Sequence, residues 1–489
     1  MNAEMGLLAI LVLPVAQAAL VLACARPPGL RDAVYMLAAC ASAGVAFFLF
    51  NETAHGAQAH VVLARPLPNV DLAFALEPLG AMMALLIGGL GLLHAIHTAG
   101  FARATHEKSP VRLMAFMALS SACALGVAFS ANLFTMFVAL QALTLAAFPL
   151  VEHNGDEAAG GAGRLFLAVL LAASIGLFLP AMVWTYAIAG VLDFRPGGVL
   201  GGLANPISAN LLLVMFVFGI AAAAVPPMHR WLTASRVAPF PALTSMYALT
   251  VLPAGCIGVF KVAAFVFGAS GLGDAHLAAR GLIVLAGAAM CAAALIALSK
   301  QDLRERLAYS CLAQSLAAVL GALLALPAGL FAAALQITAL MCSAATLLMA
   351  SGTIAAVTGR TQVSAYPGLG RVMPWTLAGF ALASASMVGM PPFAGAWAKL
   401  WLIASSSSVG LVWVAVLVGL AAILTFAHLG PMAASALSAR APPDAFIRPD
   451  GASFLLVAPV ALGAVATLSL LVFANSLSEF LSPVWTPPP

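Results

Sequence analysis

The sequence predicts an all-α membrane protein that crosses the lipid bilayer many times. Of its 489 residues, 63% are hydrophobic and 7% are charged, and the mean hydropathy is +1.08. A soluble domain carries about 25% charged residues, so this chain cannot cover a globule in water. The composition therefore excludes soluble enzymes and nucleic-acid-binding proteins. The net charge of +4 is too small to indicate an anionic partner.

Fourteen apolar stretches are candidate membrane spans, because a spanning helix needs about 20 mostly apolar residues. They begin near Leu7, Ala33, Leu76, Arg112, Asn132, Leu165, Asn210, Pro241, Leu282, Arg306, Gly329, Pro374, Gly410 and Phe454. The connections between them are short, and none is long enough to form a soluble domain.

Lysine and arginine are distributed unevenly over the connections. Fifteen of them lie in loops that follow odd-numbered spans, whereas the other face holds only Arg65, Arg195 and Arg280. Because basic loops stay in the cytoplasm, both termini are predicted to face away from it. Lys261 and Lys399 belong to neither group, since both lie within or at the edge of apolar segments.

Two segments interrupt the helix pattern in the same way. AVPPMHRWL (residues 224–232) contains Pro226 and Pro227, and GMPPFAGAWAKLW (residues 389–401) contains Pro391 and Pro392. A proline pair frees backbone carbonyls, which are tolerated at membrane depth only against protein or a wet cavity. Matching broken helices in two halves of a chain indicate a transporter built from repeats. The alternative is a pair of ordinary proline kinks.

At these residues the chain resembles the antiporter-like membrane subunits shared by respiratory complex I, Mrp-type cation/proton antiporters and energy-converting membrane hydrogenases. The resemblance covers roughly residues 115–404. It is carried by NLFTMFVALQALTLAAFPLV (132–151), PPMHRWLTASRVAPFPALTSM (226–246), QDLRERLAYSCLAQ (301–314) and the second proline segment.

The resemblance implies fourteen helices with two inverted five-helix repeats, in a bacterial inner membrane, with both termini in the periplasm. We therefore expect three N-terminal helices in residues 1–110 and a first repeat in residues 111–267. A second repeat should occupy residues 268–430, and a last helix and tail residues 431–489.

The buried charges that relay protons in that family are largely missing here. By resemblance, Gln141 stands where the fifth span usually has a glutamate, and Ala222 where the seventh has a lysine. Basic positions of the eighth and eleventh spans match Leu252 or Pro253, Tyr247, Gln336, Leu340 and Ala344. Only the twelfth-span lysine is kept, as Lys399. All sixteen acidic residues lie in loops or at span ends, so no carboxylate is expected in mid-membrane.

Five residues are candidates for a proton or ion path: Lys399, His229, Gln141, Gln336 and Lys261. Lys399 either exchanges protons in a wet cavity, which the resemblance favours, or extends to the outer interface. His229 either gates protons or, as we favour, caps freed carbonyls. Lys261 is expected to be an interfacial anchor, and both glutamines are expected to join helices by hydrogen bonds.

No cofactor or metal site is expected. The seven cysteines lie in apolar stretches without a CxxC pair, which is typical of small core residues. His94 and His97 are one helical turn apart but have no third ligand nearby in the sequence. No Walker motif, no GxGxxG after a strand and no pattern specific for quinone or flavin occurs.

Three functions remain open. The first is an antiporter-like subunit of a larger complex, such as a complex I-like NADH-quinone oxidoreductase or a membrane hydrogenase, with its own pumping reduced or lost. The second is the membrane partner of a cytoplasmic zinc protein in an inorganic-carbon accumulation system. The third, a working cation/proton antiporter subunit, is disfavoured by the missing charges. The expected partners are other membrane subunits, the lipid bilayer and a cytoplasmic redox or zinc-binding subunit.

Overall fold

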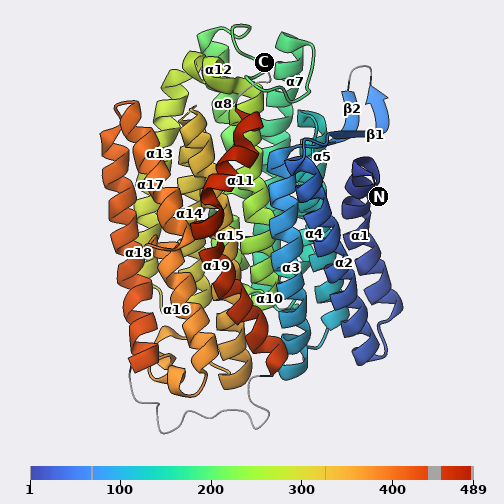
Figure 1. Cartoon of the computed structure of the whole chain (residues 1–489), viewed down its shortest axis with the longest axis vertical. Helices are drawn as coiled ribbons and strands as arrows, with labels where there is room; N and C mark the ends of the chain where they lie inside the picture. The colour runs from blue at the N-terminus through green and yellow to red at the C-terminus, as the bar shows by residue number, and fades with distance from the viewer. Residues whose placement is uncertain (1, 68–69, 325, 439–452, 486–489) are drawn as a thin grey trace.

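The computed structural model describes residues 2–67, 70–324, 326–438 and 453–485, which form one bundle of helices aligned with the long axis (Figure 1). Nine spans are single helices: α1 Ala3–Ala23, α2 Pro28–Ala54, α3 Pro78–Ala104, α4 Pro110–Ala128, α5 Leu133–Val151, α13 His276–Ser299, α14 Leu303–Leu323, α15 Pro327–Thr358 and α18 Val412–Ser438. The all-α membrane fold expected from the composition is therefore confirmed.

Two further spans contain π-helical turns. One consists of α6 Glu157–Ala173, η1 Ser174–Phe178 and α7 Leu179–Ala189. The other consists of α10 Phe240–Thr244, η4 Ser245–Leu249, α11 Val251–Lys261, η5 Val262–Phe267 and α12 Gly268–Asp274. These two and the nine single helices make eleven described helices long and apolar enough to cross a membrane.

The other three expected spans are shorter, broken or bent. The first of them is α8 (Pro206–Gly219), which is followed by η2 (Ala221–Ala223) and α9 (Arg230–Ala234). Another is divided into α16 (Pro374–Val388) and α17 (Ala394–Ser408), and the last, α19 (Phe454–Leu481), bends within its length. All fourteen predicted spans thus have a helical counterpart in the described residues.

Helix starts follow from polar caps and prolines in the sequence. The Asn132 side chain accepts a hydrogen bond from the Thr135 nitrogen at 2.8 Å and so caps α5. Asp156 caps α6 in the same way. Other helices, among them α3 and α15, have proline in their first turn, where no intrahelical donor is lost.

A β-hairpin at one end of the bundle was not predicted. Strands β1 (Ala59–Leu67) and β2 (Val70–Leu76) pair antiparallel between α2 and α3. Asn132 fixes β2 to the start of α5, because its side-chain nitrogen donates to the Asp71 carbonyl at 2.8 Å. We call this the hairpin end, and the opposite end, where α3 ends and α14 begins, the basic end (Figure 1).

The centre of the bundle is α15, which is buried along its apolar length and contacts α3, α14, α16, α17 and α19. Small residues permit this packing. A Cβ at Gly321 of α14 would lie 3.1 Å from the Ala333 nitrogen, so α14 and α15 touch through their backbones. The helices of the interior are therefore closely packed, and little space is left between them for further side chains.

Candidate functional site

The first helix break lies between α8 and α9 and is closed by a tryptophan. The indole Nε1 of fully buried Trp231 donates to the Ala221 carbonyl at 2.9 Å. Gly255 of α11 lets the break pack closely, because a Cβ there would lie 2.1 Å from the Ala223 nitrogen. The Ala221 carbonyl also accepts from the Ala224 nitrogen at 2.9 Å, so the indole is a second, uncharged donor to it.

Gln141 of α5 lies beside this break. Its side-chain nitrogen donates to the Ser174 hydroxyl in η1, so it joins two helices, while its oxygen is buried without a hydrogen-bond partner among the described residues. Gln141, Ser174 and Ala222 line one cavity of about 10 Å³. That volume holds roughly one water molecule.

His229 lies at the N-cap position of α9, and its role differs from the expected one. The cap on the freed carbonyl comes from Trp231, two residues further along. The Nδ1 atom of His229 is buried without a hydrogen-bond partner in the described part of the chain. The expectation that His229 caps the break is therefore wrong.

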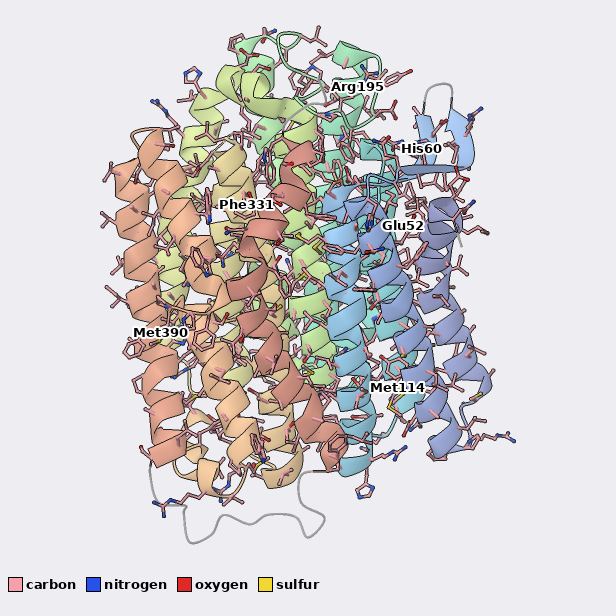
Figure 2. The ribbon with its side chains drawn as sticks, in the orientation of Figure 1. Glu52, His60, Met114, Arg195, Phe331 and Met390 are labelled. Atoms are coloured by element: carbon pink, nitrogen blue, oxygen red, sulfur yellow. The ribbon has the colours of Figure 1, made fainter. Side chains whose placement is uncertain are left out.

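The second break lies between α16 and α17 and contains a lysine. Figure 2 shows Met390, beside the Pro391-Pro392 pair, about halfway along the bundle. The Lys399 ammonium donates to the carbonyls of Met387 and Val388, both at 2.7 Å, at the end of α16. Lys399 is 7% exposed, so the alternative that it extends to the outer interface is wrong.

Gln336 of α15 forms a buried pair with Gln314 of α14. Its side-chain nitrogen donates to the Gln314 oxygen at 2.8 Å, which is a hydrogen bond between helices of the kind expected. The Gln336 oxygen is buried without a partner among the described residues. Neither amide can take up a proton at neutral pH, so the pair offers no titratable group.

The largest difference between the expected and the observed site concerns Lys261, at the end of α11. It is fully buried rather than interfacial. Its ammonium lies 2.5 Å from a carboxylate oxygen of Glu77, which precedes α3, and donates to the Ser130 carbonyl at 2.8 Å. The Phe194 ring centre is 5.2 Å away. A buried ion pair therefore exists at the hairpin end, supplied by two segments far apart in the chain.

Two buried groups near the basic end, Arg306 and His428, were not among the residues expected at the site. Arg306 lies where a predicted span begins, and its guanidinium donates to the carbonyls of Leu298, Lys300 and His428. It therefore caps α13 and ties it to α18. Both ring nitrogens of His428 are buried without a hydrogen-bond partner among the described residues. In the sequence, the signal that could have indicated a buried group here is a histidine inside an apolar run.

Partly buried polar contacts surround the basic end. Glu107, between α3 and α4, lies 3.1 Å from His153, and this hydrogen bond holds the pKa of the Glu107 carboxyl below its ordinary value. Lys300 lies 2.8 Å from Glu305, which raises the pKa of the Lys300 ammonium. These contacts fix the connections at this end and belong to neither helix break.

Two broken helices, buried polar groups beside them and small-residue packing are the architecture expected of transporter-like membrane proteins. No cluster of three or more His, Cys, Asp or Glu side chains that could hold a metal ion occurs among the described residues. Residues 130–425 match the family described as NADH:quinone oxidoreductase/Mrp antiporter, TM. The chain belongs to this family.

Similar proteins carry names from quinone oxidoreductases. The chain is 27% identical to NADH-quinone oxidoreductase subunit N of Desulforudis audaxviator, over 72% of this chain and 70% of that protein. It is 28% identical to NAD(P)H-quinone oxidoreductase chain 5 of a Synechocystis strain, over 68% of this chain and 49% of that protein. The match thus spans about half the length of the chain 5 relative.

Solved structures share the fold over nearly the whole chain. A chain of the Mrp complex from Dietzia sp. superposes with a TM-score of 0.83 at 22% identity, covering 99% of this chain and 97% of that one. A chain of respiratory complex I from Thermus thermophilus also gives 0.83 at 22% identity, covering 98% of both.

Proposed function

We propose that this chain works as an antiporter-like subunit of a larger energy-converting membrane complex, and that its own proton translocation is reduced or lost. Family membership supports the first part, as does the full-length likeness to single chains of an Mrp complex and of complex I. The proposed setting is a bacterial inner membrane with both termini in the periplasm. The proposed partners are other membrane subunits and a cytoplasmic redox or zinc-binding subunit.

One observation carries the second part of the proposal. Gln141 and Ala222 stand where the family resemblance places a glutamate and a lysine, and they line the same water-sized cavity. The place of a buried ion pair is therefore taken by an amide and a methyl group. A proton relay needs titratable groups or a chain of ordered waters at hydrogen-bonding distance. Neither side chain is titratable, and the cavity has room for only about one water molecule.

The surroundings of Lys399 support the same proposal. Its ammonium is bound by two backbone carbonyls, and no described ion pair includes it. A lysine in this position stabilises the end of α16 in the way that a basic side chain caps a helix C-terminus. The chain would then act as a scaffold, or pass conformational change between neighbouring subunits.

The test begins with the complex itself. The tagged chain is purified in mild detergent, and co-purifying proteins are identified by mass spectrometry. Quinone-reductase or hydrogenase subunits support the proposal. A zinc-binding cytoplasmic protein without redox subunits contradicts it and favours the inorganic-carbon system.

A measurement of proton flux then tests whether the proton relay of this chain is lost. The purified complex is reconstituted into liposomes, and protons moved per turnover are compared between the native chain and Lys399→Met. We expect the same ratio, because Lys399 is not needed for transfer. Loss of flux in a Lys399→Met complex that keeps all its subunits would overturn the proposal. Lys399→Arg is the control for the charge at this position.

A further inference from the structure

A large cavity opens at the hairpin end, outside both helix breaks. Its volume is about 770 Å³, and its lining includes Glu4, His60, Glu77 and Phe194. Figure 2 shows His60 on the hairpin at this end. The volume is many times what one water molecule needs, and the lining contains polar groups, so the cavity can be hydrated.

The Lys261 ammonium lies directly behind the wall of this cavity. Glu77 and Phe194 line the cavity, and both also contact the ammonium. The Lys261 side chain is 0% exposed, whereas the Glu77 side chain is 22% exposed. Glu77 therefore connects a buried cation with the space that water can enter.

We propose that Glu77 and Lys261 form a proton-binding site that is reached from the hairpin end through this cavity. In the binding step, a hydronium ion gives its proton to the Glu77 carboxylate, which becomes a neutral carboxylic acid, and water is released. The charge of the pair changes from zero to +1. The inference goes beyond the proposed function, because it holds whether or not the chain moves protons across the membrane.

The contacts around Lys261 permit this change of charge. After Glu77 is neutralised, the ammonium still has the Ser130 carbonyl at 2.8 Å and the Phe194 ring. Both favour a cation, through hydrogen bonding and through the ring quadrupole. Protonation of Glu77 therefore leaves no buried charge without a partner.

Other charged groups near the site come from several elements. Glu4 of α1 and His60 of β1 line the same cavity, and exposed Asp193 and Arg195 flank Phe194 in the chain. Neither Glu4 nor His60 forms a described ion pair with Lys261. Glu77 is thus the carboxylate of this cavity that contacts the Lys261 ammonium directly.

The experiment measures protonation of Glu77 by infrared difference spectroscopy. The intact complex in lipid vesicles is titrated with acid, and the C=O band of the protonated carboxyl is recorded for native protein and Glu77→Gln. The difference between the two spectra is the Glu77 signal. In Lys261→Met, a larger share of Glu77 should be protonated at a given pH than in the native protein, because the opposite charge that favours the carboxylate has been removed.

Controls test whether the titrating group is Glu77 and whether the Lys261 charge acts on it. Glu4→Gln removes another carboxylate of the cavity and should leave the Glu77 band unchanged. Lys261→Arg keeps the charge and serves if Lys261→Met does not fold; its titration should match the native one. The proposal is overturned if Glu77→Gln removes no titrating band, or if the band titrates identically with and without the Lys261 charge.

Discussion

Two lysines of this chain are buried, and their surroundings give them different chemistry. Lys261 has a carboxylate, a carbonyl and an aromatic ring around its ammonium. Lys399 has two carbonyls at a helix end. A carboxylate can take up a proton from water, whereas a backbone carbonyl cannot. The neighbours, more than the lysines themselves, therefore decide which position can exchange protons.

The sequence predicted that Lys399 belongs to the second break. For Lys261 it predicted an interfacial anchor, whereas the side chain is buried. Lys399 and its partners, Met387 and Val388, lie in one segment, so the motif contains all of them. Lys261 depends on Glu77 and Ser130, which are distant in the chain. Only the packing of α4 and α5 against α11, with β2 fixed to the start of α5, brings these groups together. No local sequence pattern predicts this arrangement.

At the basic end, Glu107 gives a prediction about pH. Its pKa is lowered from 4.5 in the folded protein, mainly by the hydrogen bond to His153. The folded state therefore binds fewer protons than the unfolded state, and the resulting stability is present above pH 4.5 and is lost as the pH falls through the lower folded value. We expect Glu107→Gln to cost about 1 kcal/mol at neutral pH and progressively less in acid.

Thermal unfolding of the detergent-solubilised protein at several pH values measures this difference. Glu479→Gln is the matched control, since Glu479 is exposed and has no ion pair among the described residues. A constant difference between native protein and Glu107→Gln at every pH would show that the carboxylate charge is not involved.

At the scale of elements, the two breaks share a sequence pattern but are stabilised differently. In the first, the Trp231 indole binds the freed Ala221 carbonyl. In the second, Lys399 binds the carbonyls, and Trp397 is 36% exposed. The proline pairs predicted where the helices break. They did not predict which side chain closes each break, because that depends on the depth and direction of the following helix.

This difference predicts unequal effects of the same substitution. Trp231→Phe keeps an aromatic ring but removes the indole hydrogen bond to the Ala221 carbonyl, which then keeps only the Ala224 nitrogen as a donor, so it should destabilise the protein by about 1 kcal/mol. Trp397→Phe should change stability by about 0.5 kcal/mol or less. Both can be followed by thermal unfolding with a thiol-reactive dye, because Cys256, Cys311 and Cys342 are buried in the folded chain. Equal effects would mean that the indole hydrogen bond does not hold the first break.

The hairpin shows where element prediction failed. β2 contains a single polar residue, Asp71, and its last residue, Leu76, was assigned to the start of a span. In a chain this apolar, short strand signals are hidden by the hydropathy of neighbouring helices. The hairpin nevertheless positions Glu77, which follows β2 directly.

For the whole molecule, the distribution of basic residues predicts the orientation in the membrane. His60 at the hairpin end and Lys108 at the basic end are both exposed. In intact cells, a membrane-impermeant thiol reagent should label His60→Cys and leave Lys108→Cys unlabelled until the inner membrane is opened. The native chain, with its own cysteines, provides the background. Labelling of Lys108→Cys alone in intact cells would reverse the proposed topology.

The division into repeats stays a prediction at this scale. The expected boundary after residue 267 falls where η5 passes directly into α12, and the one after residue 430 falls within α18. The two broken helices lie one on each side of the first of these boundaries, as a repeated architecture requires.

The burial of α14 and α15 has a consequence for how the protein is made. Among the described helices that can cross a membrane, α14 is the least apolar, and it carries Gln314, whose partner Gln336 lies in α15. During synthesis α14 leaves the ribosome first, so Gln314 meets the insertion machinery before its partner exists. A nascent chain that stops between the two helices would expose that amide to lipid. Membrane insertion of this segment therefore depends on α14 and α15 entering the bilayer as a pair.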